Sequence, residues 1–426
     1  MLHAMKPLLL LHFTVAAATV LAAPPDPKFH AQDLDKTVQI GYGIAIADVD
    51  GDKLPDILLA DKTQFRWYKN PGKRGAEWPK YVLAENLTKN DNVCIAAQDI
   101  DGDGKCEIAV GAEWNPGDTV NSGAVFYLIP PADRTQKWEP VKFPSVEPTT
   151  HRMRWLQIGE KQWGLVVVPL HGRGNKNGEG AAAKTLLYLP PTDPKAEWKS
   201  VVIDESMHAT HNFVPRGVRL SVQADGRKFM SAPSVALAGK EGILALTGGA
   251  TPEAGSWSSR KVIWAPPAAG KEESPLMPVA DFKGAGELKF GRLPLSGGEL
   301  MVTVEPMHGN QLVAYARPGG KPVRHVLTDK LLQGHALACG DLLGLGSDQV
   351  VVGWRGNIPP KPEDQVGIAL WTPLDDSGEL WRETVVDKNE TACEDLTLAD
   401  LDGDGKPDII AAGRATHNLR ILWNDR

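Results

Sequence analysis

Three near-copies of one short pattern limit the folds open to this chain more than any other feature. They are IADVDGDKLPDILLA at 46–60, AQDIDGDGKCEIAVG at 97–111 and LADLDGDGKPDIIAAG at 398–413. Each copy reads as an apolar strand, an acidic glycine-rich turn and a second apolar strand. Weaker copies are found in three other places: 156–169, 218–232 and 339–354. Such self-similarity along a chain indicates a propeller or a solenoid.

A second phrase recurs in the positions expected of an outer strand. It is present as EWPKYVL, KWEPVKF, EWKSVVI and LWRETVV, and its first three tryptophans, Trp78, Trp138 and Trp198, are spaced by 60 residues. The chain has 43 glycines and 33 prolines and keeps no long helical stripe, so short strands are expected throughout. Grouping the strands gives seven units, which begin near residues 38, 91, 148, 208, 285, 334 and 391. We therefore predict an all-β, seven-bladed β-propeller of four-stranded blades, a single domain over residues 24–426.

The last of the seven units has only three strands before the chain ends. The piece KFHAQDLDKTV at 28–38 resembles the outer-strand phrases, so we expect this N-terminal strand to complete the last blade. Closure by strands from both ends removes the unpaired edges that invite aggregation.

Residues 1–23 are typical of a secretory signal peptide. Lys6 precedes the apolar run LLLLHFTVAAATVLAA, which ends in small residues before Pro24 and Pro25. We expect cleavage after Ala22 and export to the periplasm or the exterior; an uncleaved anchor is the alternative. No other apolar stretch approaches the ~18 residues of a spanning helix, so we expect no membrane insertion of the mature chain.

Charge and cysteine content exclude some classes of partner and linkage. The net charge is −7 and the basic residues form no run, so nucleic acid is not an expected partner. There is no CxxC motif, and three of the four cysteines lie in apolar strand-like runs, which favours buried free thiols over disulfides. The cysteines are Cys94, Cys106, Cys339 and Cys393.

The acidic turns have the spacing of calcium loops. Carboxylates occupy positions 1, 3, 5 and 9, a backbone carbonyl is available at 7, and a glycine permits the bend that brings oxygens to about 2.4 Å from a cation. We expect three structural Ca²⁺ sites; solvated acidic hairpins are the alternative. The ligands would be Asp48, Asp50, Asp52 and Asp56 in the first loop, Asp99, Asp101, Asp103 and Glu107 in the second, and Asp400, Asp402, Asp404 and Asp408 in the third.

These loops resemble those of the FG-GAP/VCBS repeat proteins. The resemblance implies a propeller whose blades carry calcium loops between their first and second strands. Three blades depart from the loop pattern, because Gly159, Ala224 and Gly344 stand where acids are needed, so no ion is expected there. Propellers of this kind serve adhesion, sugar binding and catalysis alike.

Histidines gather at one kind of position in the repeat. In a four-stranded antiparallel blade, the start of strand one and the end of strand two share the face opposite the acidic turns. Seven of the nine histidines outside the leader fall at such positions, whereas His30 and His325 lie in outer-strand phrases. A turn-capping role is the alternative for any one of them, but capping requires no common face. The seven are His151, His171, His208, His211, His308, His335 and His417.

Imidazoles that converge with a carboxylate suit Zn²⁺ with one position open to substrate. We expect the metal to be held by His171, His211 and His308, with Glu305 or His151 completing or supporting the set. The expected catalytic residues are His151, His335, His417, Glu305, Arg173 and Arg414. The expected substrate-binding residues are Trp114, Trp354, Arg355, Glu394 and His208.

The phrases around these histidines resemble the propeller domain of the aldos-2-ulose dehydratase family, also known as 1,5-anhydro-D-fructose dehydratases. The phrases are THRMRW, PLHGRGNKNGEG, MHATHNF, VEPMHGNQ, GHALACGDL, ACEDLTLADLDGDG and GRATHN. The resemblance implies a zinc-dependent cleft that eliminates water from a keto-sugar. The fungal enzyme also has cupin and lectin-like domains that this sequence lacks, so an isomerase activity that depends on the cupin part is not expected.

Three functions compete at this point. The first is a metal-dependent lyase that performs β-elimination on a keto-sugar, with His151 or His335 taking the α-proton and His417 or Glu305 protonating the leaving oxygen. Arg173 and Arg414 would orient the ring. The second is a calcium-stabilised module that binds a glycan or a protein without chemistry. The third is a hydrolase that uses Glu305 and Glu394 as paired carboxylates.

Overall fold

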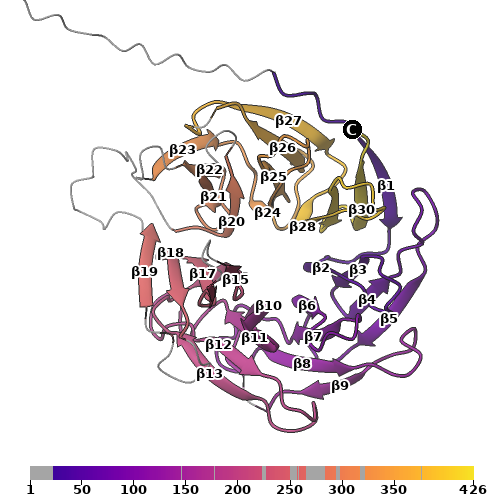
Figure 1. The fold of residues 1–426 in the computed structure, drawn as a ribbon, viewed down its shortest axis with the longest axis vertical. Coiled ribbons are helices and arrows are strands. Elements are labelled where there is room, and N and C mark those ends of the chain that lie inside the picture. The colour runs from indigo at the N-terminus through magenta and orange to yellow at the C-terminus, as the bar shows by residue number, and fades with distance from the viewer. Residues whose placement is uncertain are drawn as a thin grey trace, which may run out of the picture.

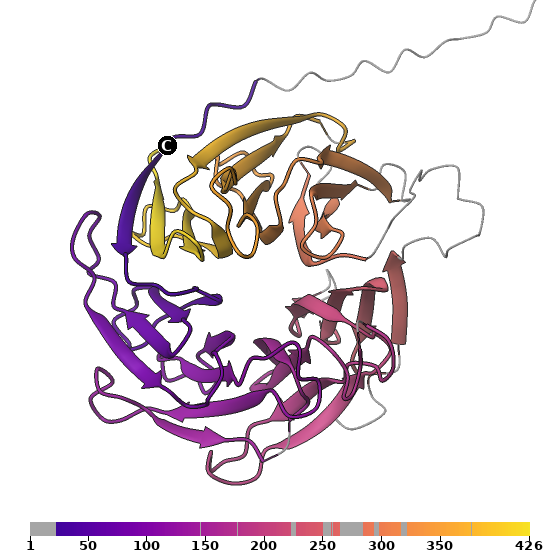
Figure 2. The same cartoon turned by 180° about the vertical axis from the view of Figure 1, so that it is seen from behind.

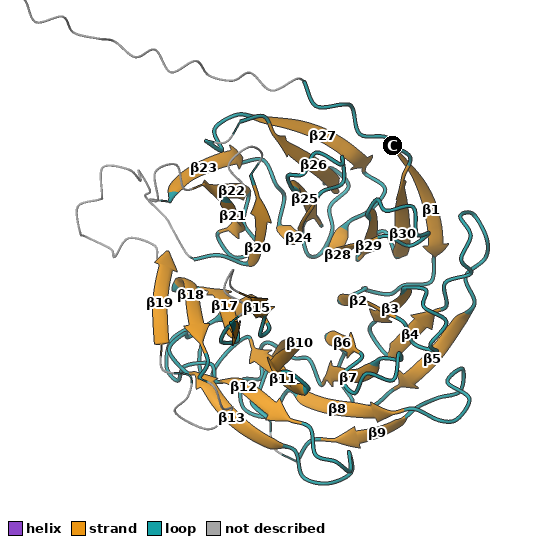
Figure 3. Cartoon of the chain, viewed as in Figure 1, coloured by secondary structure: helices purple, strands orange, loops and turns teal. Residues whose placement is uncertain are grey.

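The structure is a computed structural model that describes part of the chain. The described residues are 23–144, 146–176, 178–222, 227–249, 257, 259–264, 284–293, 298–316, 322–375 and 377–426. They form strands and loops without any helix, and the strands are arranged as blades around a central axis (Figures 1 and 3). The expected leader at 1–23 lies outside the described residues, apart from Ala23.

Seven four-stranded antiparallel sheets make up the ring, which confirms the predicted seven-bladed β-propeller. Blade one contains β2 (Gly43–Ala47), β3 (Asp56–Ala60), β4 (Gln64–Tyr68) and β5 (Lys80–Glu85). Blade two contains β6 (Cys94–Gln98), β7 (Glu107–Ala112), β8 (Ala124–Ile129) and β9 (Glu139–Lys142). Blade three contains β10 (Thr150–Gly159), β11 (Gln162–Pro169), β12 (Thr185–Leu189) and β13 (Lys199–Asp204).

The remaining blades repeat this order from the axis outward. Blade four contains β14 (Thr210–Arg216), β17 (Ser234–Gly239), β18 (Gly242–Thr247) and β19 (Ser259–Trp264). Blade five contains β20 (Glu287–Arg292), β21 (Glu299–Glu305), β22 (Gln311–Ala316) and β23 (Val323–Thr328). Blade six contains β24 (Gly334–Gly340), β25 (Gln349–Trp354), β26 (Gly367–Pro373) and β27 (Trp381–Lys388). Blade seven contains β28 (Cys393–Ala399), β29 (Asp408–Gly413), β30 (Asn418–Asn424) and β1 (Phe29–Asp35).

The N-terminal strand closes the ring as expected. β1 pairs antiparallel with β30, from Phe29 opposite Asn424 to Asp35 opposite Leu419. Figure 2 shows β1 on the outside of the ring beside the C-terminus. Blade seven is therefore made of strands from both ends of the chain, and the outer edge of β30 is paired with β1.

One weak repeat was assigned wrongly from the sequence. The segment 218–232 was read as a strand–turn–strand unit of blade four, but it forms a separate hairpin of β15 (Leu220–Val222) and β16 (Lys228–Met230). The hairpin is inserted between β14 and β17, which pair with each other. Alternating apolar residues around a polar turn occur in both situations, so the pattern alone could not distinguish them.

The second strands carry the core. Every residue of β3, β7 and β29 is buried, because each blade is packed between two neighbours and both faces of its inner strands are covered. This explains the nearly continuous apolar runs in the repeats. All four cysteines are unpaired thiols, in agreement with the prediction. Among the described residues, no helix has the length and apolar character needed to cross a membrane.

Candidate active site and metal centres

Four side chains reach the axis because the first strands of their blades are bulged. In blades three, four, six and seven the register between strands one and two shifts around the second residue of strand one. The residues at the four shifts are His151, His211, His335 and Glu394. A bulge leaves its extra residue unpaired and re-aims the side chain. The first strands of blades one, two and five pair without such a shift.

His308 reaches the same place by another route. It lies in the loop after β21 and has a left-handed backbone, with φ of +54°. The next residue must be glycine, because a Cβ on Gly309 would lie 2.2 Å from the carbonyl oxygen of Glu305. This tight turn brings the His308 ring back over the axis.

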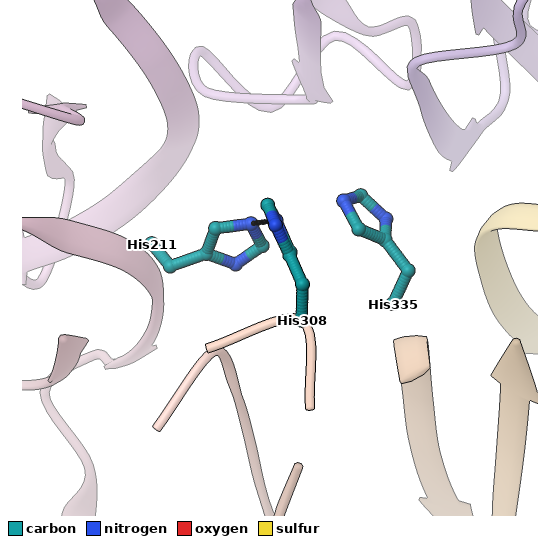
Figure 4. Close-up of side chains that lie close together, drawn as sticks. All are labelled: His211, His308 and His335. Atoms are coloured by element: carbon teal, nitrogen blue, oxygen red, sulfur yellow. Dashed lines mark hydrogen bonds between the residues drawn. The ribbon is translucent and has the colours of Figure 1, made fainter. Parts of the chain in front are cut away.

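His211, His308 and His335 form a cluster (Figure 4). Each offers a ring nitrogen that lies within 4.8 Å of the others, and the Nε2 atoms of His211 and His308 are 2.6 Å apart. The ring of His335 lies edge-on to His211, with centroids 5.3 Å apart, and 4.9 Å from His308. Three imidazoles are the protein ligands of one class of catalytic zinc site, and because the 2.6 Å contact is a hydrogen bond, His211 and His308 would move slightly apart to hold an ion.

Backbone carbonyls orient two of these rings. His211 Nδ1 lies 2.8 Å from the oxygen of Gly286, and His335 Nδ1 lies 2.6 Å from the oxygen of Glu394. Nδ1 must donate in both contacts, so the lone pair is on Nε2, which is the usual arrangement of metal-binding histidine. Glu287, held by the Asn212 side chain at 2.6 Å, brings a carboxylate oxygen to 3.3 Å from His211 Nδ1.

Electrostatics keep the imidazoles of this cluster neutral. Burial holds the pKa values of His151, His211, His308 and His335 well below their usual range. The positive charge of Arg152 lowers all four further, as does that of Arg355 for all except His151, and as do neighbouring histidines for all except His211. Neutral imidazole is the form that binds a metal or accepts a proton.

The cluster opens into a cavity of about 230 Å³. The ring of His151 stacks on Trp114, with centroids 4.9 Å apart, and Arg152 Nη1 lies 3.0 Å from His151 Nε2. On the other side Arg355 and Arg414 donate to the carboxylate of Glu394 at 2.9–3.1 Å. The cavity thus combines imidazoles, an indole and three guanidinium groups.

Eight of the fourteen residues expected at the site meet in this cavity. Those that line it are His151, His211, His308, His335, Trp114, Arg355, Glu394 and Arg414. His335 takes the place expected for His171, whose main chain forms an isolated bridge with Ala209. The sequence placed His151, His211 and His335 before their strands, whereas each is the second residue of one.

The other expected residues lie outside the cavity. His208 pairs with Glu241 at 2.9 Å, and Arg173 donates to the backbone oxygens of Val120 and Val146. Trp354 lines a separate cavity between blades five and six. His417 lies at an adjoining opening, which shares Arg355 and Arg414 with the main cavity.

Glu305 is locked inside blade five. It is fully buried, accepts hydrogen bonds from Thr303 and Tyr315 at 2.5 and 2.7 Å, and pairs with Arg324 at 2.7 Å. Glu394 faces the cavity instead, so the pair suggested for a hydrolase does not face a common space. In the sequence, an acid at the end of a buried strand looks the same whether it is packed in the core or faces an active site.

Sequence reasoning missed Tyr42 and Arg152. Tyr42 lines the cavity under the guanidinium of Arg414 and donates to Asp91 at 2.9 Å. Arg152 follows His151 in the quoted phrase THRMRW, so its position beside a bulged histidine was a usable signal. Tyr42 precedes the first strand of blade one, where the sequence has no histidine to mark the position.

The three acidic turns share one backbone arrangement on the opposite face. The first aspartate of each loop accepts at least two backbone N–H groups, which include those of Gly51 and Lys53, Gly102 and Gly104, and Gly403 and Gly405. The last acid accepts one from within the loop, from Val49, Ile100 or Leu401, and Asp56 and Asp408 each accept a second from Asn70 or Asn424. Acidic oxygens come within 4.8 Å of one another in each loop, in the sets Asp48, Asp50 and Asp56; Asp99, Asp101 and Glu107; and Asp400, Asp402 and Asp404. Oxygen donors at this spacing fit calcium.

The loops differ in nearby positive charge. Lys69 contacts Asp50 and lies 2.9 Å from Asp52, and Arg74 contacts Asp402 and lies 3.2 Å from Asp404. No lysine or arginine among the described residues pairs with the acids of the blade-two loop. The pKa values of the last acids are raised chiefly by burial, to about 7 for Asp56 and Glu107 and about 6 for Asp408.

Comparison with known proteins supports the resemblance drawn from the repeats. Residues 48–110 match the FG-GAP-like repeat. This FG-GAP-like repeat spans the acidic loops of blades one and two.

Aldos-2-ulose dehydratase of Phanerodontia chrysosporium is a curated relative, 27% identical over 346 residues. The alignment spans 75% of this chain but only 34% of that protein, so the chain spans about a third of the relative's length.

Solved structures align over most of this chain, but with TM-scores below 0.5 and low sequence identity. A chain in the crystal structure of BBS1N in complex with ARL6DN has a TM-score of 0.49 and 13% identity, and covers 94% of this chain and 98% of itself. A chain in the mitotic checkpoint complex has a TM-score of 0.48 and 13% identity, with 97% and 98% covered. The fold assignment therefore rests on the sheet topology described above.

Proposed function

We propose that the chain is an exported, metal-dependent lyase that removes water, or a glycosyl group, from a keto-sugar. The observation that carries this proposal is the cluster of His211, His308 and His335 in a cavity that also contains a fourth imidazole and three arginines. The similarity to a protein named aldos-2-ulose dehydratase supports the choice of substrate class and reaction.

The three clustered histidines would hold a zinc ion through their Nε2 atoms. Two of them already donate Nδ1–H to backbone carbonyls, so their lone pairs are on Nε2, and the Nε2–Nε2 hydrogen bond between His211 and His308 would give way to the ion. A zinc ion bound there supplies Lewis acidity toward a carbonyl oxygen, which increases the acidity of the neighbouring C–H.

His151 is the imidazole of the cavity outside this cluster, so it is the proton acceptor in the proposal. Arg152 donates to its Nε2, which therefore carries the lone pair. A substrate that displaces Arg152 would present its α-C–H to that lone pair. His151 takes the proton, and the electron pair of the broken C–H bond forms the new double bond as the C–O bond to the leaving group breaks.

The leaving oxygen requires a proton from another group. Tyr42 lines the cavity, and burial together with Asp91 raises its pKa, so its hydroxyl keeps its proton at neutral pH. In the structure this proton is donated to Asp91, so Tyr42 would turn from Asp91 to protonate the departing hydroxyl and give water. The proton on His151 then passes through solvent to the tyrosinate, which restores both groups. Arg355 and Arg414 hold negative charge on the substrate oxygens, and Trp114 offers an apolar face to the sugar ring.

Structural calcium completes the proposal. Ions in the loops at 48–56, 99–107 and 400–408 would neutralise crowded acids and brace the hairpins of blades one, two and seven. An ion that binds only the folded state stabilises by about 2.7 kcal/mol when its concentration is a hundredfold above Kd.

The test is an assay of purified protein with bound metal measured in the same sample. We expect 1,5-anhydro-D-fructose, an aldos-2-ulose or a 3-keto-glycoside to develop enone absorbance. His151→Ala should lower kcat by about 10²- to 10⁴-fold because the proton acceptor is lost. His208→Ala, outside the cavity, is the matched control and should retain activity. Metal-replete folded protein that converts none of these sugars would contradict the proposal.

A further inference from the structure

We propose that a groove on the acidic-loop face, between blades two and three, is a second site that binds a neutral saccharide. It lies on the opposite face of the ring from the histidine cavity, does not depend on the proposed lyase activity, and shares Asp101 and Glu107 with the acidic loop of blade two. The groove has a volume of about 550 Å³, which is within the usual range of ~300–1,000 Å³ for ligand pockets.

Loops from the two blades form this groove. One side contains the acidic turn between β6 and β7, and the other contains the β10–β11 turn and the β12–β13 loop. Pro190, Pro191 and Pro194 stiffen the second side, because the backbone φ of proline is fixed. The walls are therefore formed before any ligand arrives.

The floor of the groove carries polar side chains. The side chain of Tyr127 is 8% exposed and lines the groove, and its hydroxyl makes no hydrogen bond to a described residue. Glu107, also 8% exposed, accepts from Ile100 N and belongs to the acidic set of the blade-two loop. The Tyr127 hydroxyl lines the groove, so it can exchange hydrogen bonds with a ligand that carries hydroxyl groups.

The wall adds an aromatic face. Trp163 is partly buried and lines the groove, and its indole N–H has no acceptor among the described residues. An indole plane suits the C–H face of a pyranose, while its N–H can donate to a hydroxyl. Gln162 and Thr192 supply further donors and acceptors at the rim.

The charge of the groove excludes an anionic ligand. Asp101 and Glu107 contribute two carboxylates, against the single ammonium of Lys161. Without calcium these carboxylates repel phosphate or uronate groups, and with calcium they are occupied as its ligands, so Lys161 is in both states the single cationic side chain that lines the groove. Alternating donors and acceptors beside an aromatic plane therefore favour a neutral sugar chain.

Calorimetric titration with cellohexaose, maltohexaose, laminarihexaose and xylohexaose tests the proposal, with calcium and with EGTA. At least one probe should bind the wild-type protein in one of these buffers. Trp163→Ala should weaken that binding about tenfold, which is the loss of about 1.4 kcal/mol. Tyr127→Phe removes a single oxygen without disturbing the core and should weaken it by about three- to tenfold.

Two control variants locate the binding. Phe229→Ala removes an exposed aromatic ring from the β15–β16 hairpin and should bind as wild type. His308→Ala alters only the histidine cavity and should also bind as wild type. The proposal is overturned if no probe binds, if Tyr127→Phe and Trp163→Ala bind normally, or if His308→Ala abolishes binding. Should Trp163→Ala fail to fold, Tyr127→Phe alone decides.

Discussion

At the scale of single residues, the metal set depends on a bulge that the amino-acid sequence does not display. From the sequence, His171 was expected as a metal ligand and His335 as a catalytic residue, although both lie near an inner strand end. His335 is the unpaired second residue of β24, so its ring turns to the axis, whereas the main chain of His171 is bridged to Ala209. Conformation of the main chain, rather than residue type, decides between them.

Substitution of these two histidines should therefore have different effects on bound metal. His335→Ala removes one of three ligands and should lower zinc affinity by at least about tenfold. His171→Ala leaves the cluster intact and should retain the metal content of wild type. Measurement of metal by mass spectrometry after dialysis against a graded chelator series checks both. Equal loss in the two variants would show that the cluster in Figure 4 is not the metal site.

At the scale of one element, the acidic loops were predictable almost completely. The spacing of acids and glycines alone predicts where each loop lies in its blade and where its backbone bends. A nine-residue turn between two paired strands can adopt few backbone conformations that bring its acids together. Lys69 and Arg74 were not predictable, since they reach the loops from other connections. The loop of blade two has no such cation among the described residues, so we expect it to bind calcium most tightly.

The pH dependence of stability should report on these loops. In the absence of ions, buried Asp56, Glu107 and Asp408 have raised pKa values, so the folded protein retains protons that the unfolded chain loses near pH 4. Their contribution to stability therefore falls as the pH rises toward about 7. Calcium replaces these protons and should raise Tm more at pH 8 than at pH 5.

A matched variant separates the loops from the rest of the molecule. The histidine cavity has the opposite pH dependence, because protonation of buried imidazoles destabilises the fold at acidic pH. The triple variant Asp56→Asn, Glu107→Gln, Asp408→Asn should remove most of the pH-dependent difference in the calcium shift. An identical shift at both pH values in wild type would show that these acids do not bind the ion.

At the scale of the whole molecule, the first and last blades are joined by Asp35. It ends β1 and accepts hydrogen bonds from Tyr68 at 2.6 Å, Arg66 at 3.1 Å and Lys80 at 3.0 Å in blade one. Burial alone would raise its pKa, but the hydrogen bonds from Tyr68 and Thr37 outweigh burial and lower the pKa to about 2. The closing strand β1 thus pairs with β30 in blade seven and is hydrogen-bonded to blade one through Asp35.

Asp35→Ala should lower the free energy of unfolding by about 3 kcal/mol, because Arg66 loses one of its buried partners. The lowered pKa means that this contribution is complete above the unfolded value near 3.9 and disappears as the pH falls through about 2. Urea denaturation of wild type and variant at several pH values measures the difference. Asp26→Ala, at an exposed position near the same terminus, should be neutral, and a neutral Asp35→Ala would refute the role of Asp35.

Most of the fold could be predicted from the sequence, whereas only part of the residue set that lines the histidine cavity could. Strand number, blade boundaries and closure follow from repeats and apolar runs, which depend on local patterns. The inserted β15–β16 hairpin depends on which strands pair, and the burial of Glu305 depends on which neighbours pack against it. Neither pairing nor packing can be predicted from a local sequence pattern.

The uneven distribution of bulges breaks the sevenfold repetition of the ring. A ring of identical blades would present the same residue seven times around its axis, which suits no substrate that lacks the same symmetry. Shifted registers in blades three, four, six and seven instead give each blade its own donor, without altering the blade itself. A new specificity could therefore arise through insertion or deletion of one residue in one inner strand, while the remaining blades continue to fold the ring.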